Sequence, residues 1–294
     1  MQKTSVYLPE DLKRDLSAFA RRWDRSEAEL VRLAVERLVR AAEAESAPGV
    51  APMPAEPGPR LVGVGVGPSD PGLVTVRAAT ILRSADRVFA AATATDAIGR
   101  AEAIVRAVAP EVRIERLVFD IAGDAAAREA SLREAGTTLV AALDTGAVVA
   151  CVILGDPNVF STFPALARVV AAQRPAVPVT TVPGVMAFQE LASRTSTVLA
   201  EDGEQLLIGV GGEDDDGLGA LFADAHSTVV LYKGGRHLPS VARSLRGRDR
   251  LDGAVMGEMI GLPGGRCVSV ESVADQPASY LATVIVPAVR DDAS

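Results

Sequence analysis

Cysteine and histidine are scarce in this sequence. Its 294 residues include two cysteines, Cys151 and Cys267, and two histidines. The cysteines lie among apolar residues without CxxC spacing, a pattern that favours two buried thiols in a reducing compartment over a disulfide framework or a thiolate zinc site. Two histidines argue against a histidine-based metal centre. The sequence therefore predicts a chain that holds no metal.

Long apolar segments are also missing. No apolar run approaches the ~18 residues that cross a bilayer, and the polar N-terminus MQKTSVYLPEDLKRDL lacks the apolar core of a signal peptide. Hydrophobic residues nevertheless make up 48% of the chain, which is enough to bury a sizeable core and excludes disorder as its main state. We expect a folded cytoplasmic protein.

Charge and proline divide the chain into a small basic head and an acidic body. Residues 1–40 carry a net charge of +2, whereas the rest of the chain carries −10. Residues 41–59 contain five prolines and no aromatic residue, a composition typical of a linker. As a coil this linker spans roughly 25 Å, so we expect the units that flank it to act semi-independently. Within the body we expect two α/β domains, at 60–175 and 176–290.

The head, residues 1–40, has the pattern of a short strand followed by two helices. Residues 3–8 alternate with a period of two and end at Pro9, which predicts a strand. A helix is expected over Glu10–Arg22, and the Ser26–Glu29 pair is typical of a capping box that opens a second helix. The apolar stripes of the two helices comprise Leu12, Leu16, Phe19, Ala20, Leu30, Val31, Ala34, Val35 and Leu38.

A lone strand with two helices cannot close a core in about 40 residues, so a second copy must supply the missing strand. The head therefore predicts a homodimer. Its pattern, TSVYLPEDL followed by RSEAELVR, resembles the ribbon-helix-helix DNA-binding proteins, in which paired strands lie in the major groove. The resemblance implies that Lys3, Ser5 and Tyr7 face base edges and that the amides of Ser26 and Glu27 hold a phosphate. The alternative is a dimerisation module that does not bind DNA.

The body alternates short Val-, Ala- and Ile-rich strands with helical stretches, which indicates an α/β fold with a mostly parallel sheet. A strand over 61–66 is followed by Gly67-Pro68-Ser69-Asp70-Pro71, and a strand over 148–154 by Gly155-Asp156. The first turn does not fit a dinucleotide site, because two prolines and an acid stand where a phosphate needs free amides. Asp70 and Asp156 either border one ligand cleft at the carboxyl ends of the strands or cap the helices that follow.

The second half of the body repeats this alternation. Strands are expected at 179–185, 205–210, 228–232 and 280–286. The acidic run 213–216 is interpreted as part of a solvated loop.

Six segments of the body occur in the order and spacing of the tetrapyrrole methylases. They are GVGVGPSDPGLVTVRAA, ILGDPNVFSTF, TVPGVMAF, LAEDGEQLLI, LYKGGRHLPSV and GLPGGRCV, and the resemblance spans residues 60–288. Within that family the chain most resembles the C(20)-methyltransferases that act on precorrin-2. The resemblance implies a fold of two α/β domains with S-adenosylmethionine in the cleft between them, preceded here by a small α+β ribbon-helix-helix domain.

The resemblance also implies a set of site residues. Those expected to contact S-adenosylmethionine are Pro68, Leu154, Gly155, Asp156, Val159, Met186, Ala187, Lys233 and Ile260. Met186 stands where the family commonly has a threonine or serine. Asp70 aligns with an acid that related members are thought to use near the substrate, so it is the expected catalytic residue.

Methyl transfer is chemically compatible with these residues. The reaction is an in-line displacement that gains most from alignment and exclusion of water, and the attack needs no strong base. Asp70 can orient the macrocycle or take the proton released afterwards. The carboxylates of a tetrapyrrole need cationic partners, and the candidates are Lys233, Arg236, His237 and Arg266, unless these are ordinary surface charges.

We therefore expect an S-adenosylmethionine-dependent C-methyltransferase acting on precorrin-2 or cobalt-precorrin-2 in cobalamin biosynthesis. The alternative is a DNA-binding transcription regulator whose degenerate methylase body senses S-adenosylmethionine or a corrinoid precursor. A third interpretation is a methylase of the same fold with a different substrate.

Overall fold

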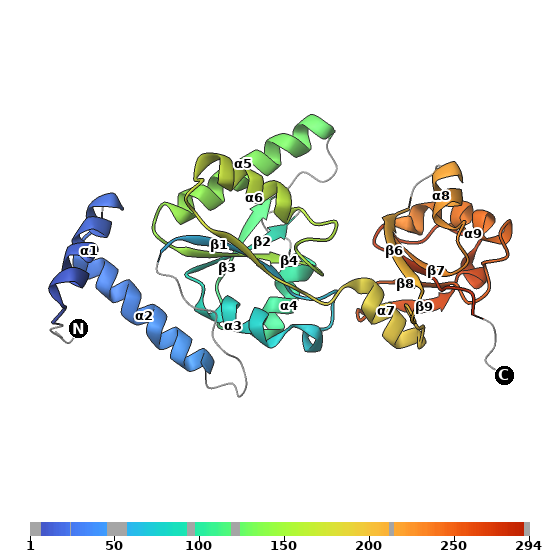
Figure 1. Ribbon diagram of the computed structural model, residues 1–294, viewed down its shortest axis with the longest axis horizontal. Helices are drawn as coiled ribbons and strands as arrows, with labels where there is room; N and C mark the ends of the chain where they lie inside the picture. The colour runs from blue at the N-terminus through green and yellow to red at the C-terminus, as the bar shows by residue number, and fades with distance from the viewer. Residues whose placement is uncertain are drawn as a thin grey trace. The chain divides into compact units, whose positions relative to one another are not determined.

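The computed structural model describes residues 7–23, 25–45, 58–92, 98–118, 124–211 and 215–290. The chain divides into two compact units (Figure 1). The first comprises residues 1–65 and 74–184, and the second comprises 66–73 and 185–294. Each unit contains one five-stranded sheet, and each is described here by itself.

The two helices of the head form where the sequence predicts them. Helix α1 spans Glu10–Arg22 and α2 spans Glu27–Glu45, so α2 continues past residue 41, where the linker was expected to begin. The capping box is confirmed, because the Ser26 amide donates to Glu29 Oε2 at 3.0 Å and the Glu29 amide donates to Ser26 Oγ at 3.2 Å. The Ser26 amide, which was expected to hold a phosphate, thus donates to the Glu29 side chain just before the helix begins.

The expected strand at 3–8 falls largely outside the described residues, and Lys3 and Ser5 lie there. Tyr7, the third residue expected to contact DNA, is described and its side chain is 97% exposed.

Trp23 joins the head to the first unit. Its ring lies 5.2 Å from the ring of Phe19, centroid to centroid. The same indole lies over Gly58 and over Gly146. A Cβ atom added to Gly146 would stand 3.6 Å from the indole ring. Gly146 has φ +81° and belongs to the turn before strand β4, Val148–Ile153. The head helices therefore belong to the first compact unit, whereas the linker composition predicts a semi-independent head.

The sheet of the first unit is parallel throughout, as predicted. Its strand order is β3-β2-β4-β1-β5. The strands are β1 Arg60–Gly65, β2 Arg87–Ala92, β3 Ile114–Val118, β4 Val148–Ile153 and β5 Val179–Val182. Every residue of β4 is buried, as expected for a central strand covered on both faces.

Helices cover both faces of this sheet (Figure 1). The helices are α3 Val76–Ser84, α4 Arg100–Val108, α5 Ala125–Leu143 and α6 Phe163–Gln173. α5 and α6 pack on one face, where Leu139 and Leu166 meet Leu61 and Phe89 of the strands in one buried cluster. α3 and α4 lie on the other face.

The sheet of the second unit is mixed, with strand order β6-β7-β10-β8-β9. The strands are β6 Gln205–Val210, β7 Ser227–Tyr232, β8 Val255–Glu258, β9 Arg266–Ser269 and β10 Thr283–Val286. Only β6 and β7 pair in parallel, whereas β7, β10, β8 and β9 follow one another antiparallel. The expectation of a mostly parallel sheet is therefore wrong for this unit, because β8, β9 and β10 are joined by short connections in which the described residues form no α-helix.

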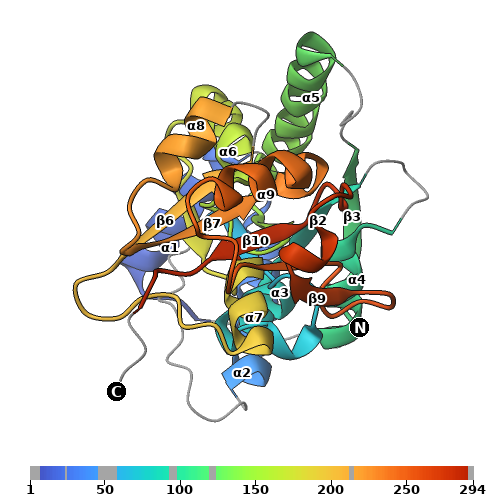
Figure 2. The same ribbon diagram turned by 90° about the vertical axis from the view of Figure 1, so that its right-hand side faces the viewer.

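Two layers of helix flank the second sheet (Figure 2). α8 Asp215–Leu221 and α9 Leu238–Arg246 lie on one side, and α7 Ala187–Thr195 lies on the other. The described part of the acidic run, Asp215 and Asp216, begins α8 and does not form the expected loop.

The unit boundaries differ from the predicted domains at 60–175 and 176–290. Strand β5 pairs with β1, which carries the first unit on to residue 184. Residues 66–73 leave β1 and join the second unit. Among the described residues, no helix combines the length and apolar character that crossing a membrane requires.

Candidate active site

Three turns meet at the carboxyl edge of the first sheet, and glycine makes their close approach possible. Gly65 ends β1, Gly155 follows β4 and Gly184 follows β5. A Cβ atom on Gly65 would lie 2.6 Å from both the Gly155 oxygen and the Gly184 nitrogen, and one on Gly184 would lie 2.1 Å from the Gly155 oxygen. Any side chain at either position would force the turns apart.

Asp156 ties two of these turns together. Its Oδ1 accepts the Asn158 amide at 2.8 Å, and its Oδ2 accepts the Gly184 amide at 3.1 Å. Asn158 adds a second link, since its Nδ2 donates to Thr181 Oγ1 at 3.1 Å. Both carboxylate oxygens of Asp156 therefore accept backbone amides, and this residue sets the shape of the two turns beside Gly155.

Gly155 offers an open backbone surface beside this junction. Its φ is +70°, a left-handed conformation that favours glycine, and no atom lies within 4 Å of where a Cβ would stand. Leu154 and Val159, on either side, are half-buried and supply apolar surface. A ligand can therefore approach the main chain here, and a Cβ atom would occupy the space it needs.

In the second unit, the segment Pro68–Asp70 is held against the loop that contains Ile260. The Ser69 hydroxyl donates to the Ile260 carbonyl oxygen, and Ser69 is buried. Gly261, with φ +76°, lies so close that its Cβ would stand 2.5 Å from Ser69 Oγ. Two motifs separated by about 190 residues in the sequence are thus brought together.

Asp70 itself is half-buried at the start of the short 3-10 turn Pro71–Leu73. Its Oδ1 accepts the Gly72 amide at 2.7 Å. This bond matches the capping interpretation, but it uses one oxygen, and no described residue donates a hydrogen bond to Oδ2. Asp70 therefore combines a fixed orientation with a carboxylate oxygen that can face a ligand.

Helix α7 carries the two other cofactor candidates of this unit and an ion pair that the sequence analysis missed. Met186 is the N-cap of α7 and packs with Ile260 in a hydrophobic cluster, and Ala187 begins the helix. Further along α7, Arg194 Nε donates a hydrogen bond of 2.5 Å to Glu190 Oε1. The pairing with Glu190 raises the pKa of Arg194, with smaller electrostatic contributions from Cys267 and Asp70. An i,i+4 Glu–Arg pair is common on solvated helix faces, so its spacing alone gave no signal of a site.

Two of the predicted cationic residues gather around one aromatic ring. Lys233 follows β7 in a left-handed conformation, φ +58°, and its Nζ lies 5.8 Å from the centre of the Tyr280 ring. The Arg236 guanidinium lies 5.0 Å from the same ring. Arg236 is exposed and His237 is half-buried at the start of α9. Tyr280, which the sequence analysis did not select, therefore holds two cations in place.

Arg266 is occupied by an ion pair. Its Nε donates to Glu258 Oε1 at 2.6 Å, and Glu258 Oε2 accepts the Ser279 amide at 2.7 Å. Although burial acts to raise it, these two donors bring the pKa of Glu258 below its usual value. The charge of Arg266 is thus partly compensated, so it is a weaker partner for a substrate carboxylate than Arg236.

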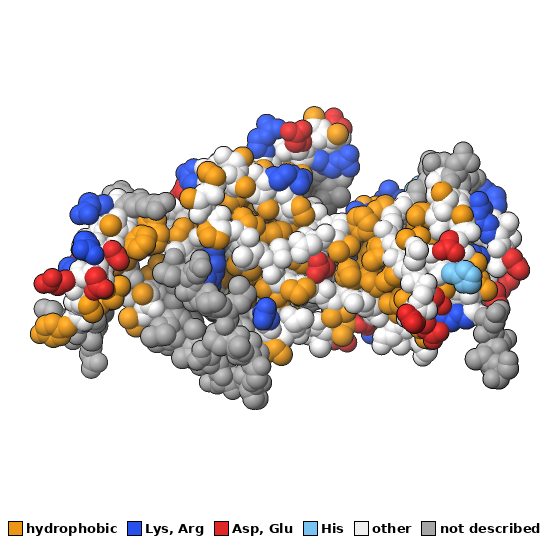
Figure 3. Space-filling view, viewed as in Figure 1, with side chains coloured by type: hydrophobic (Ala, Val, Ile, Leu, Met, Phe, Trp, Pro, Cys, Tyr) orange, Lys and Arg blue, Asp and Glu red, His pale blue; other side chains and the backbone are white. Residues whose placement is uncertain are grey.

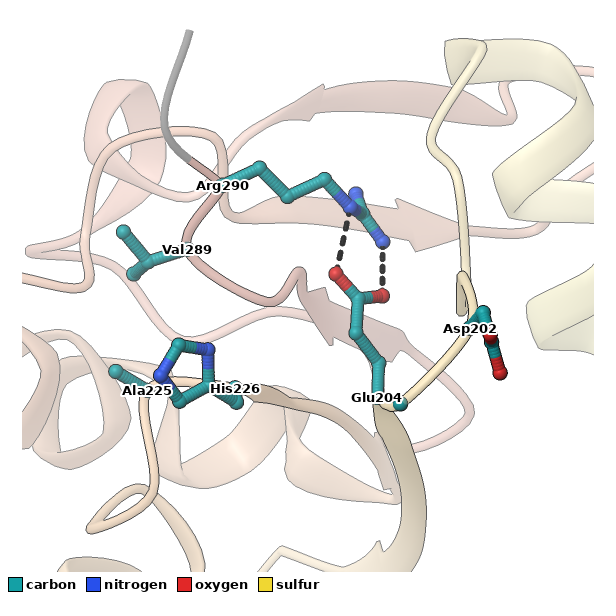
Figure 4. Close-up of a pocket in the computed structure, with 7 residues that line it drawn as sticks. Asp202, Glu204, Ala225, His226, Val289 and Arg290 are labelled. Carbon is teal, nitrogen blue, oxygen red and sulfur yellow. Dashed lines mark hydrogen bonds and ion pairs between the residues drawn. The ribbon is translucent and has the colours of Figure 1, made fainter. Parts of the chain in front are cut away.

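A cavity of about 370 Å³ lies elsewhere on the second unit (Figure 4). It is lined by Asp202, Gly203, Glu204, Ala225, His226, Val289 and Arg290. Arg290 is held to Glu204 by two hydrogen bonds of 2.8 and 2.5 Å. The cavity lies at the amino ends of β6 and β7, whereas Lys233 follows the carboxyl end of β7, so none of the predicted site residues lines it. In the described part of the chain, no three His, Cys, Asp or Glu side chains are grouped to hold a metal ion.

Known proteins resemble this chain in sequence and in fold. Residues 60–273 match the family model of the tetrapyrrole (corrin/porphyrin) methylases. The chain is 31% identical to a precorrin-2 C(20)-methyltransferase from Sinorhizobium sp, over 79% of this chain and 96% of that protein. It is 29% identical to a cobalt-precorrin-2 C(20)-methyltransferase from Salmonella typhimurium, over 77% of this chain and 95% of that protein.

Solved structures share the fold. A cobalt precorrin-4 methyltransferase matches with a TM-score of 0.59 at 18% identity, over 81% of this chain and 98% of that chain. A uroporphyrin-III C-methyl transferase from Thermus thermophilus, complexed with S-adenosylhomocysteine, matches with a TM-score of 0.54 at 26% identity, over 78% of this chain and 92% of that chain. By sequence and by fold, the chain belongs to the tetrapyrrole methylase family.

Proposed function

We propose that this protein is an S-adenosylmethionine-dependent C-methyltransferase that acts on precorrin-2 or cobalt-precorrin-2 in cobalamin biosynthesis. The relatives that carry these activities in their names align over more than three quarters of the chain. The structural observation that carries the proposal is the junction of Gly65, Gly155 and Gly184, which leaves open backbone at Gly155 in the segment that resembles the family's cofactor motif.

The residues present suit S-adenosylmethionine. That group supplies a methyl on a sulfonium, which an electron-rich ring carbon can attack. In the first unit, Gly155 would approach it through the main chain, Leu154 and Val159 would supply apolar walls, and Asp156 would keep the turns in place. The contacts proposed for the second unit are Pro68, Met186, Ala187, Lys233 and Ile260. These largely apolar residues would exclude water and align the donor, which are the contributions that a displacement at a methyl group needs most.

The cations of the second unit suit an acid-bearing macrocycle. Arg236, placed by Tyr280, is the cation best disposed to pair with a substrate carboxylate, and His237 and Arg266 are the other proposed partners. Asp70 offers Oδ2 to a ring N–H or to the proton that the methylated carbon releases. Gly72 holds the other oxygen, so the direction of this group is set before the substrate arrives.

The direct test is to incubate the purified full chain with S-adenosylmethionine and enzymatically made precorrin-2, and separately with the cobalt form. The expected result is a product heavier by one methyl group. A reaction without S-adenosylmethionine is the control. If neither precursor gains mass but uroporphyrinogen III does, the family activity stands and the proposed substrate is wrong.

The head supports a second proposal, a homodimer that binds DNA through Lys3, Ser5 and Tyr7. Apolar side chains of the head helices remain on the surface of the single chain (Figure 3): Leu12 is 51% exposed, Phe19 38% and Val35 51%. A second copy would cover this stripe. Light scattering should give twice the chain mass, and a mobility-shift titration should show salt-sensitive binding to DNA from the protein's own promoter. A change in that affinity when S-adenosylmethionine is added would favour the regulator over the enzyme.

A further inference from the structure

We propose that Lys233 and Arg236, held against the ring of Tyr280, form a two-cation site that binds two neighbouring carboxylates on one five-membered ring of the macrocyclic substrate. Tyr280 is the positioning residue of this site, because it acts through the two cations. The identity of the ligand rests on the function proposed above. Lys233, proposed there to contact the donor, is given a role toward the substrate as well.

Strand pairing brings the two parts of the site together. Thr283 of β10 lies opposite Tyr232 of β7 in an antiparallel pair. Because the two strands run in opposite directions, the segment that enters β10 lies beside the segment that leaves β7. Tyr280 belongs to the first segment, and Lys233 and Arg236 belong to the second. The register of the sheet therefore places the aromatic ring next to both cations.

Main-chain contacts fix these two segments to each other. The Ala278 amide donates to the Gly235 carbonyl oxygen at 2.8 Å. A Cβ atom on Gly235 would stand 2.1 Å from the Ser279 oxygen, so this approach requires glycine. The Ser279 amide in turn donates to Glu258 Oε2 at 2.7 Å. Tyr280, the next residue, therefore extends from a backbone that is held by two other segments of the unit.

The Tyr280 ring has both cations within the distance at which an aromatic face attracts a charge. The Arg236 guanidinium lies 5.0 Å from the ring centre, and Lys233 Nζ lies 5.8 Å from it. Neither cation forms an ion pair or a side-chain hydrogen bond with a described residue. Two like charges gathered at one ring repel each other, and an anion bound to both would offset that repulsion. Tyr280 is 43% exposed and Arg236 is exposed, so an anion can reach them from solvent.

The backbone conformation of Lys233 argues for a function of its side chain. Its φ is +58°, in the left-handed region where glycine is favoured and a side chain is strained. Glycine at this position would relieve the strain, as the sequence allows at the next two positions, Gly234 and Gly235. A lysine here therefore lowers stability, and strain of this kind is typical of functional sites.

Two cations held side by side suit a ligand with two neighbouring carboxylates. Arginine binds a carboxylate through a planar pair of donors, whereas lysine supplies a compact point charge. A five-membered ring that bears an acetate and a propionate presents two carboxylates on adjacent carbons. A ring with a single acid would engage one cation and leave the other without a partner. The site should therefore favour rings that carry two acids.

The test compares two stable porphyrins. Each pyrrole ring of uroporphyrin III carries an acetate and a propionate, whereas methyl groups replace the acetates in coproporphyrin III. Absorbance titration of the purified full chain measures the affinity for each without turnover. We expect the parent to bind uroporphyrin III at least about 10-fold more tightly than coproporphyrin III. Arg236→Gln and Lys233→Gln should each lose most of this preference.

Variants of Tyr280 test the positioning role. Tyr280→Leu removes the ring and should reduce the preference for uroporphyrin III, whereas Tyr280→Phe should restore most of it, because the contact with the cations needs only the aromatic face. Arg246→Gln is the matched control, since Arg246 is an exposed arginine in the last turn of α9. It should bind both porphyrins as the parent does. Added salt should weaken uroporphyrin III binding more in the parent than in Arg236→Gln.

Lys233→Gly separates a binding role from a structural one. Because the backbone favours glycine there, the midpoint of thermal unfolding should not fall, while uroporphyrin III binding should weaken about 10-fold. A lower midpoint with unchanged porphyrin binding would overturn the inference. So would a loss of S-adenosylmethionine affinity, measured by calorimetry, in a Lys233→Gln variant that keeps the parental preference for uroporphyrin III; the donor contact would then stand alone.

The outcomes distinguish this site from the proposed function. A parent that does not discriminate between the two porphyrins would overturn the inference, whatever reaction the protein catalyses. Methylation of precorrin-2 with a parental KM in both Arg236→Gln and Lys233→Gln would overturn the inference and leave the proposed function intact. A preference for uroporphyrin III that both substitutions remove would support the two-cation site even if precorrin-2 gains no methyl group.

Discussion

Asp156 and Gly184 are joined across the carboxyl edge of the first sheet, where the aspartate Oδ2 accepts the glycine amide at 3.1 Å. The other oxygen of Asp156 accepts the Asn158 amide at 2.8 Å, so one side chain sets the relative position of two turns. These turns form the junction at which Gly155 presents open backbone. The shape of the proposed donor site therefore depends on the hydrogen bonds that Asp156 accepts from these two backbone amides.

Replacing Asp156 by alanine should reduce both stability and donor binding. Two backbone amides lose their acceptor, which we expect to cost about 2 kcal/mol of unfolding free energy. The loosened turns should weaken S-adenosylmethionine binding about 10-fold, as measured by calorimetry. Asp224→Ala is the control, because Asp224 also holds a turn, accepting the His226 amide at 3.0 Å, but outside the proposed site. Equal weakening of donor binding in both variants would refute a specific role for Asp156.

The buried carboxylate of Glu102 should make the free energy of unfolding depend on pH. Its side chain is fully buried, and it accepts hydrogen bonds of 2.7 Å from both Arg116 and Arg106. The Arg116 hydrogen bond, opposed by burial and aided by Arg106, lowers the pKa of Glu102 from its ordinary 4.5. A carboxyl whose pKa is lower in the folded state stabilises the protein above its unfolded pKa, and this contribution is lost as the pH falls below about 4.5.

Glu102→Gln should therefore destabilise the chain most at neutral pH. We expect a loss of about 3 kcal/mol at pH 7, because two arginines lose a buried partner, and a smaller difference from the parent at pH 3.5. Urea unfolding at both pH values measures this. Glu129→Gln removes an exposed i,i+4 pair with Arg133 and should cost less than about 0.5 kcal/mol. A pH-independent loss in Glu102→Gln would contradict the assigned cause.

Trp23 is the single tryptophan of the chain, so tryptophan fluorescence reports on the contact between the head helices and the rest of the first unit. Because its indole packs over Gly146 of the first unit, the emission change on urea unfolding should coincide with the loss of helical circular dichroism. Trp23→Ala should reduce stability by about 1 to 2 kcal/mol. A tryptophan transition at clearly lower urea than the circular dichroism transition would show that the head unfolds separately.

Local features of the fold could be predicted from the sequence, whereas features that depend on distant pairing could not. The bounds of α1 and β6 were predicted residue for residue, since periodicity and Pro9 act within a few residues. Strands β8 and β9, which have four residues each, were not predicted, and the antiparallel course of β10 was missed because strand direction depends on partners far along the chain. β5 was assigned to the wrong side of the domain boundary for the same reason.

The site shows the same division. The glycine and aspartate motifs could be selected from their order along the chain. Their contacts could not, because the Ser69 bond to Ile260 joins residues that only the folded unit brings together. Tyr280 was missed because an exposed tyrosine is common on protein surfaces and carries no local mark of function.

Gly155 gives the sharpest test of the donor site, because the chain contains a matched glycine elsewhere. Gly155 has φ +70° and Gly203 has φ +84°, and no atom lies within 4 Å of a Cβ at either position. Alanine at either should therefore cost a similar strain, about 1 kcal/mol, without a steric clash. If the space beside Gly155 receives S-adenosylmethionine, Gly155→Ala should weaken its binding at least about 10-fold and Gly203→Ala should not. Calorimetric titration of both variants decides the matter: equal affinities would mean that the donor does not lie against this backbone, and the site would have to be sought elsewhere.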